Sequence, residues 1–191
     1  SEVADVYAGG AAAGSHSCAR LEDRSVWCWG DNSDEQLGDG SLISRNSPVE
    51  APDLYNVSAA STGARHSCAR QGDGTVYCWG LGFGAPLRID VTDELSSVTA
   101  GNGFSCAPYA DGTAWCWGAN DAGQLGDGTN TDAVYPSQVA ALLNVTSVAA
   151  GAAHACAIVG LGQLWCWGSN SDGQVWGTSQ LSTNLPTRTL R

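Results

Sequence analysis

The sequence predicts an all-β repeat protein, and three observations lead to this prediction. The eight Cys fall into four pairs, and ten positions separate the two members of every pair. Each pair lies within short runs of β-branched and aromatic residues that Gly, Asp and Asn interrupt, which is typical of strands joined by tight turns. No stretch of the chain has a convincing helical period. We therefore expect four equivalent units of antiparallel strands.

The spacing of the Cys pairs sets the length of the repeat. Successive pairs begin 50, 38 and 50 residues apart, so the second unit is shorter than the others. At 191 residues the chain is long enough for one domain with a core of its own. The expected organisation is a single repeat domain, 1–191, whose units are approximately 1–48, 49–90, 91–136 and 137–191.

The two Cys of each pair are expected to face each other across a hairpin. The sequence "GDG" (72–74) lies midway between Cys68 and Cys78, which predicts a three-residue hairpin loop whose last Gly is left-handed. The first unit has Arg24 at that position, where a side chain strains or reshapes the turn. Directly opposed residues of a non-hydrogen-bonded antiparallel pair lie ~4.5 Å apart at Cα, within the range of a disulfide. We expect one disulfide in each unit, formed by Cys18 and Cys28, Cys68 and Cys78, Cys106 and Cys116, and Cys156 and Cys166.

Three patterns suggest metal binding, but none fits a known ligand arrangement. Structural zinc sites use paired ligands two to four residues apart, whereas these paired Cys are ten apart. His16, His66 and His154 occupy one position of the repeat, but Phe104 takes that position in the third unit, which favours a hydrogen-bonded packing role. The acidic loops after the "CWG" motifs lack the alternating ligands and final Glu of a calcium loop. We expect no metal and no cofactor.

The "CWG" strands place aromatic side chains on one face of each sheet. In "VYCWG", Tyr77 and Trp79 share one face, and Cys78 lies on the other. The corresponding Trp of the other units are expected to pack between neighbouring sheets, and a ligand-stacking role is the alternative. Trp176 is different, because it stands in a polar loop. We interpret it as the replacement for the Leu of "GQLG" and expect it to be exposed.

Charge and Cys content limit the classes of partner and the cellular compartment that are expected for the chain. The formal net charge is −11, no Lys occurs, and no basic stretch offsets the acidic field, so nucleic acid is not an expected partner. No apolar run approaches the ~20 residues that span a bilayer, so membrane insertion is not expected either. An even number of regularly spaced Cys indicates a disulfide framework, and such frameworks persist in oxidising compartments. The chain is therefore expected to be secreted, extracellular or periplasmic.

The consensus unit resembles a known repeat family. It reads "G-x-x-H-S-C-A", then "D-G-T-V-W-C-W-G-x-N", then "G-Q-L-G-D-G-T" and a Pro, which is similar to the repeats of the regulator of chromosome condensation family. The segment "WGANDAGQLGDGT" (117–129) carries the most specific part of the resemblance. The resemblance implies a β-propeller in which every unit is a blade, a four-stranded antiparallel sheet. The Cys-containing form is similar to versions in secreted bacterial proteins.

The resemblance alone does not select a function. The founding nuclear member of the family is a nucleotide exchange factor for a small GTPase and docks on chromatin. Disulfide-capable pairs, the acidic charge and the lack of a basic tail argue against that role here. A secreted bacterial relative inhibits β-lactamase by binding it, which is a precedent for protein binding outside the cell. Four blades at seven-blade geometry leave open edges. The alternatives for covering them are a tighter four-bladed closure, self-association into a larger ring, docking in a bigger assembly, or extra repeats in a longer native chain. We expect a protein partner or self-association through these edges.

The leading functional hypothesis is a secreted, non-catalytic scaffold that mediates protein–protein interaction. No nucleophile elbow, phosphate loop or His-Glu metal helix is present, so no enzyme activity is expected. The alternatives are a carbohydrate-binding (lectin-like) protein, which requires several exposed Trp, and a structural subunit of an extracellular assembly. Loops that depart from the consensus supply the candidate partner contacts, which are Phe83, Leu87, Arg88 and Trp176. Two "N-V-[ST]" sequons, at Asn56 and Asn144, are candidate glycosylation sites.

Overall fold

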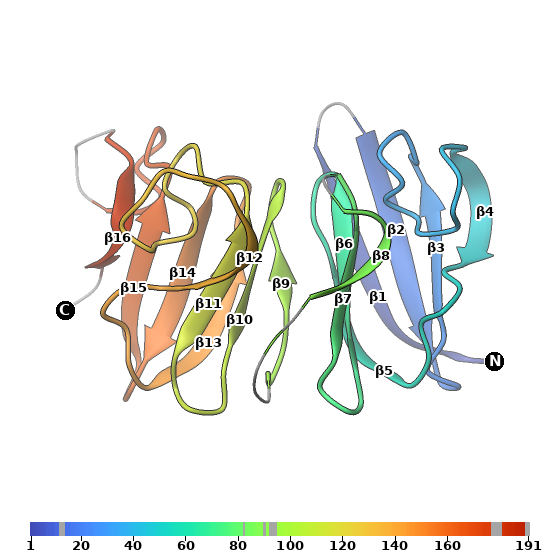
Figure 1. The fold of residues 1–191 in the computed structure, drawn as a ribbon, viewed down its shortest axis with the longest axis horizontal. Coiled ribbons are helices and arrows are strands. Elements are labelled where there is room, and N and C mark those ends of the chain that lie inside the picture. Colours follow the sequence, from blue (N-terminus) through green and yellow to red (C-terminus); the bar gives the residue numbers. More distant parts are fainter. Residues whose placement is uncertain (12–13, 82, 90, 92–94, 177–180, 190–191) are drawn as a thin grey trace. The chain divides into compact units, whose positions relative to one another are not determined.

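The computed structural model describes residues 1–11, 14–81, 83–89, 91, 95–176 and 181–189, and strands are the only regular secondary structure in this part of the chain. The sixteen strands form four separate four-stranded antiparallel sheets (Figure 1). Each sheet is one blade, and its strands follow one another in chain order. The predicted fold class, an all-β propeller-type repeat protein with four blade units, is confirmed.

The chain forms two compact units, 1–91 and 92–191, with two blades in each. The first unit contains β1 (Val3–Ala11), β2 (Gly14–Leu21), β3 (Val26–Gly30) and β4 (Arg45–Glu50) in one blade, and β5 (Val57–Thr62), β6 (His66–Gln71), β7 (Val76–Gly80) and β8 (Gly84–Ile89) in the next. The second unit contains β9 (Thr99–Ala100), β10 (Phe104–Pro108), β11 (Ala114–Gly118) and β12 (Ala133–Gln138), then β13 (Val145–Ala150), β14 (His154–Val159), β15 (Gln163–Gly168) and β16 (Thr183–Arg188). That the four blades form one domain stays a prediction.

A disulfide closes the central hairpin of every blade. The paired Cys are directly opposed in the strand register, with Cα atoms 4.0 to 4.1 Å apart, and no Cys of the described chain is free. The four bonds join Cys18 to Cys28, Cys68 to Cys78, Cys106 to Cys116, and Cys156 to Cys166, as the sequence predicts.

The third residue of the hairpin loop is left-handed in all four blades. Gly74, Gly112 and Gly162 have φ values of 92°, 83° and 103° in the predicted left-handed position. Arg24 holds the same conformation with a φ of 67°, so the turn is strained rather than reshaped. Its Nη1 donates a hydrogen bond of 2.5 Å to Asn56 Oδ1, a contact that the Gly of the other turns cannot make.

Within each unit, the disulfide face of one blade packs against a Trp of the next blade. In the first unit Trp79 is fully buried in a core with Cys18, Cys28 and Leu37. The second unit repeats this core around Trp167, with members that include Cys106, Cys116 and Leu125. The packing role predicted for these two Trp is confirmed. Each core therefore includes a disulfide, an indole and a Leu from the loop between the third and fourth strands.

Removal of one disulfide should destabilise the chain by an amount that loop closure sets. The Cys106→Ala/Cys116→Ala variant releases a hairpin of eleven residues, for which chain entropy predicts a loss of about 3 kcal/mol. Urea unfolding followed by circular dichroism measures the loss, with the reduced and alkylated wild type as reference. Non-reducing mass mapping checks that the other three pairs remain. An unchanged unfolding midpoint would show that the bond contributes nothing to stability.

Candidate interaction site

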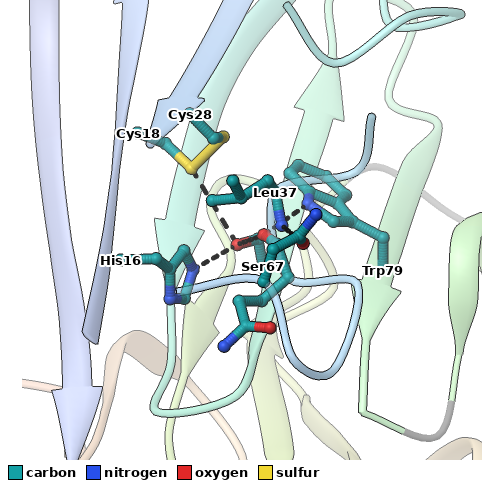
Figure 2. The surroundings of a disulfide bond; sticks show 8 residues. His16, Cys18, Cys28, Leu37, Ser67 and Trp79 are labelled. Carbon is teal, nitrogen blue, oxygen red and sulfur yellow. Dashed lines mark hydrogen bonds between the residues drawn. A yellow bond between two sulfur atoms is a disulfide. The ribbon is translucent and has the colours of Figure 1, made fainter. Parts of the chain in front are cut away.

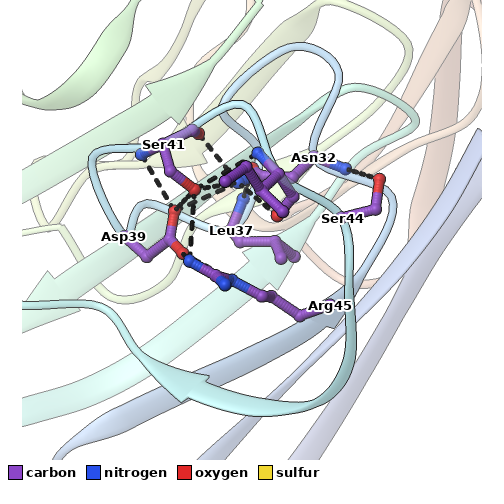
Figure 3. A network of polar contacts seen from close by, with 7 residues as sticks. Asn32, Leu37, Asp39, Ser41, Ser44 and Arg45 are labelled. Carbon is purple, nitrogen blue, oxygen red and sulfur yellow. Dashed lines mark hydrogen bonds and ion pairs between the residues drawn. The ribbon is translucent and has the colours of Figure 1, made fainter.

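The loop between the third and fourth strands of the first blade folds around one buried amide. Asn32 is fully buried; its Nδ2 donates to Ser41 O at 2.8 Å and to Asp39 Oδ1 at 3.1 Å, and its Oδ1 accepts from Leu37 N at 2.9 Å (Figure 3). Asp39 also pairs with Arg45, with the two charged atoms 2.8 Å apart. The loop therefore closes on Asn32 and directs Leu37 into the core between the blades.

Two other blades repeat this loop, and the second blade lacks it. Asn120 Oδ1 accepts from Leu125 N at 2.9 Å, and Asn170 Oδ1 accepts from Val175 N at 2.8 Å. In the second blade only three residues separate β7 from β8. We predicted no structural role for these three Asn, although their recurrence after "CWG" could have indicated one.

The equivalence of Val175 with the core Leu corrects one prediction. Trp176 does not replace the Leu of "GQLG"; buried Val175 does, and Trp176 takes the position of Gly38 and Gly126. Trp176 is 54% exposed, as expected. The sequence interpretation was one residue out of register, because the buried Asn that fixes the loop had not been recognised.

The loop of the first blade meets the second blade through a chain of hydrogen bonds. Gln36 O accepts from Trp79 Nε1 at 2.9 Å and from Ser67 Oγ at 3.1 Å (Figure 2). His16 Nε2 lies 2.7 Å from the same hydroxyl. Because Ser67 gives its only hydrogen to Gln36, the neutral His16 donates through Nε2. The polar groups in this contact between the two blades are satisfied, with one exception. His16 Nδ1 is a buried atom without a partner in the described chain.

The second unit keeps the indole contact and replaces the polar pair. Trp167 Nε1 donates to Gln124 O at 2.9 Å, which matches the first unit. Phe104 and Ala155 occupy the positions of His16 and Ser67, so an apolar pair substitutes for a hydrogen-bonded one. The repeated His position is therefore a packing position between blades. Among the described residues, no group of three or more His, Cys, Asp and Glu side chains is placed to hold a metal ion.

The buried imidazoles of the first unit stay neutral near physiological pH. Burial lowers the pKa of His16 to about 4, and the charge of Asp31 opposes the shift only in part. Burial also lowers the pKa of His66 to about 4, and the charge of His16 adds to the effect. Burial lowers the pKa of His154 as well, although this residue is partly exposed.

The predicted partner contacts fall in both units. Leu87 and Arg88 are exposed on β8, the outer strand of the second blade, and Leu87 is 44% exposed. Phe83 lies just before this strand and is partly buried, with its ring centroid 6.0 Å from that of His66. Trp176 belongs to the second unit, in the loop of the fourth blade. Phe83, Leu87 and Arg88 thus belong to the first unit and Trp176 to the second, and the contact role of all four stays a prediction.

The two sequons occupy equivalent exposed turns. Asn56 and Asn144 have left-handed φ values of 54° and 58°, each just before the first strand of a blade. Both side chains are exposed, and the Asn56 oxygen accepts the hydrogen bond from Arg24. Their glycosylation stays a prediction.

Acidification should destabilise the first unit through its imidazoles. An unfolded His has a pKa near 6.5, so the unfolded chain binds more protons than the folded chain between pH 6.5 and about 4. The free energy of unfolding should therefore fall as the pH falls through this window, by up to about 3 kcal/mol for each fully buried imidazole. Urea unfolding at several pH values measures the slope.

The second unit supplies the control for this prediction. The His16→Phe/Ser67→Ala variant introduces the pair found at Phe104 and Ala155 and removes one of the two buried imidazoles. Its unfolding free energy should depend less on pH than that of the wild type. Equal pH dependence in the two proteins would contradict the assignment to His16.

Comparison with solved structures places this geometry in a known fold. Human WBSCR16 is similar over 99% of this chain and 53% of that chain, with a TM-score of 0.85 and 21% identity. Yeast RCC1 (Prp20), solved bound to Kap60, is similar over 92% of this chain and 47% of that chain, with a TM-score of 0.82 and 22% identity. Prp20p of Saccharomyces cerevisiae gives a TM-score of 0.79 at 22% identity, over 92% of this chain and 48% of that chain. The chain spans about half the length of these proteins, and the likeness concerns the fold alone.

Sequence comparison identifies the repeat itself. No curated protein matches the chain significantly. The described chain also contains no helix that is long and apolar enough to cross a membrane. The model of the regulator of chromosome condensation (RCC1) repeat matches residues 23–70 and 111–158, and a second model of that repeat matches residues 95–124 and 145–174. These matches cover more than half of the sequence, and the chain belongs to the RCC1 repeat family.

Proposed function

We propose that the chain is a secreted, non-catalytic scaffold that binds a protein partner through exposed loops and outer strands of its blades. One observation carries the proposal. Three residues that depart from the repeat consensus are exposed: Leu87, Arg88 and Trp176. They belong to blades in which a disulfide closes the central hairpin. Variable exposed residues on a rigid repeat scaffold are where binding specificity normally lies.

The disulfides support the assignment to an oxidising compartment. All eight Cys are paired within their own hairpins, and each bond spans only ten positions of sequence. Cytosolic reductants keep such thiols reduced, whereas secreted proteins retain them as disulfides. The cores of both units include a disulfide, so reduction would weaken the packing between blades.

The environment of the Trp favours a protein partner over a carbohydrate. Stacking on sugars at equivalent sites would require several exposed indoles. Trp79, Trp117 and Trp167 are fully buried, and among the described residues Trp176 is the only Trp that is more than half exposed. A lone exposed indole suits a single contact in a protein interface, where Trp is enriched.

The structural relatives support the class of partner but not its identity. The solved yeast RCC1 is bound to Kap60, and the study of Prp20p concerns its binding to Gsp1p and histones. All of these are protein partners of those proteins. For this chain, the net charge of −11 favours a partner with a basic surface, whose association would slow as salt screens the attraction.

Capture from the extracellular fraction of the source cells tests the proposal. The immobilised chain with intact disulfides should retain a defined protein, and the Leu87→Ser/Trp176→Ser variant should retain at least about tenfold less. The Leu161→Ser variant is the matched control, because Leu161 is fully exposed at a hairpin turn outside the proposed contacts. Capture should weaken with increasing ionic strength.

Two results would overturn this proposal. Equal retention by the wild type and the Leu87→Ser/Trp176→Ser variant would show that neither residue contacts the retained protein. Binding to glycans with quenching of the Trp176 fluorescence, and no retained protein, would favour the carbohydrate alternative.

A further inference from the structure

One turn of the second unit contains the only Asn of the sequence that a Gly follows. Of the nine Asn, Asn102 alone has a Gly, Gly103, as its next residue. A side-chain amide can react with the backbone nitrogen of the following residue, and Gly presents that nitrogen without a Cβ beside it and with few backbone restrictions. The pair is therefore the place in the chain where a side-chain amide is most open to attack by its own backbone.

The structure places this pair in an exposed turn between β9 and β10. Gly101 N donates to Phe104 O at 2.8 Å across the turn, which leaves Asn102 and Gly103 outside the strand pairing. Asn102 is exposed, and its side-chain amide has no hydrogen-bond partner among the described residues. Within the same part of the chain, the Gly103 nitrogen donates no hydrogen bond either. Neither reacting group is therefore held back by another contact.

The Asp–Gly pairs of the central hairpins have the same spacing but are protected. Asp73 Oδ1 accepts from Thr75 N at 2.9 Å, and Asp111 Oδ1 accepts from Thr113 N at 2.8 Å. Hydrogen bonds, first from the backbone of Thr75 and from the hydroxyl of Thr113, lower the pKa of these two carboxyls, so both are ionised. An ionised carboxylate is a poor electrophile. Asn102 differs, because its side chain is neutral, unbound and able to lose ammonia.

We propose that Asn102 is a site of spontaneous deamidation. The Gly103 nitrogen loses its proton and forms a bond to Asn102 Cγ, while the Cγ–Nδ2 bond breaks and the amide nitrogen takes up a proton and leaves as ammonia. Water then opens the cyclic imide at either of its carbonyls, which leaves aspartate or isoaspartate at position 102. Water is the only co-reactant, and nothing is oxidised or reduced. The inference goes beyond the proposed scaffold function and does not depend on its partner.

The isoaspartate product alters the backbone where the turns of two blades meet. Asn102 N donates to Ala152 O at 2.9 Å, and Gly101 lies so close to Gly151 that a Cβ on it would be 2.4 Å from Gly151 O. Phe104, which ends the turn, is fully buried in the core of the unit. Isoaspartate adds a methylene to the main chain, so the lengthened turn must displace either the contact with Ala152 or the packing of Phe104. Aspartate keeps the backbone and adds only a charge.

Ageing of the intact, disulfide-bonded chain tests the inference. Peptide mass spectrometry should show the mass gain of an amide-to-carboxyl change at Asn102 at least about tenfold faster than at the exposed Asn46, which Ser47 follows. The rate should be higher at mildly alkaline than at neutral pH, because the attacking nitrogen must lose its proton. Both aspartate and isoaspartate peptides should appear, because the imide opens at either carbonyl.

Two variants test the roles of the amide and of the Gly. Asn102→Ala places at this turn the residue that the fourth blade has at Ala152, and the turn should then stay unmodified. Gly103→Asn keeps a residue that tolerates the left-handed φ of 82° but adds a side chain beside the attacking nitrogen. It should slow the change at Asn102 by at least about tenfold, with fragment ions assigning the position.

The effect on stability is measured on the aged molecules. Anion exchange isolates them, because each has gained a negative charge, and peptide mapping gives their isoaspartate content. Fractions rich in isoaspartate should unfold at lower urea than the Asn102→Asp variant, which has the same charge on an unaltered backbone.

Four results would overturn the inference: equal rates at Asn102 and Asn46 in the folded chain, aspartate as the only product, an unchanged rate in folded Gly103→Asn, or isoaspartate molecules as stable as Asn102→Asp. None of these measurements involves a partner, so the scaffold proposal and this one fail separately.

Discussion

The hydrogen bond from an indole to the loop carbonyl of the preceding blade is the contact on which the structure of each unit depends. In both units a Trp is fully buried, its Nε1 is satisfied by Gln36 or Gln124, and a Gly with positive φ makes room for the ring. A buried indole without that acceptor would leave a polar group unsatisfied. The loop must therefore present its carbonyl at a fixed place, and the buried Asn amide does this by holding the loop from inside.

The disulfides and these contacts act at different levels. Each disulfide closes one hairpin and makes one blade rigid, but it joins no blade to another. Packing between blades comes from the loop, the indole and the face that carries the disulfide. The second blade shows that the two can be separated, because it keeps Cys68 and Cys78 although only three residues separate β7 from β8. A blade can thus be closed by its own disulfide without carrying this loop.

Local spacing predicted the parts of the fold that depend on one unit. The Cys pairing and the left-handed turns follow from distances along the sequence within a hairpin, and the structure confirms both. The Ser67 partner of His16 lies 51 residues away on the next blade, so no local pattern could indicate it. The one signal that linked the two positions was their simultaneous replacement, by Phe104 and Ala155, in the second unit. The register of Trp176 was missed because Asn170, rather than the Gly-rich consensus, fixes that loop.

The contact between blades also explains how the repeats diverge without losing the fold. The His16 and Ser67 pair and the Phe104 and Ala155 pair fill the same space, but only the first needs a neutral imidazole. Ala in place of Ser67 alone would leave the buried His16 Nε2 unpaired, so the His depends on the Ser. The Gly that faces the indole has no such substitute, since a side chain of any kind meets the indole. In the fourth blade Trp176 takes the position of this Gly, while buried Val175 beside it keeps the place of the core Leu.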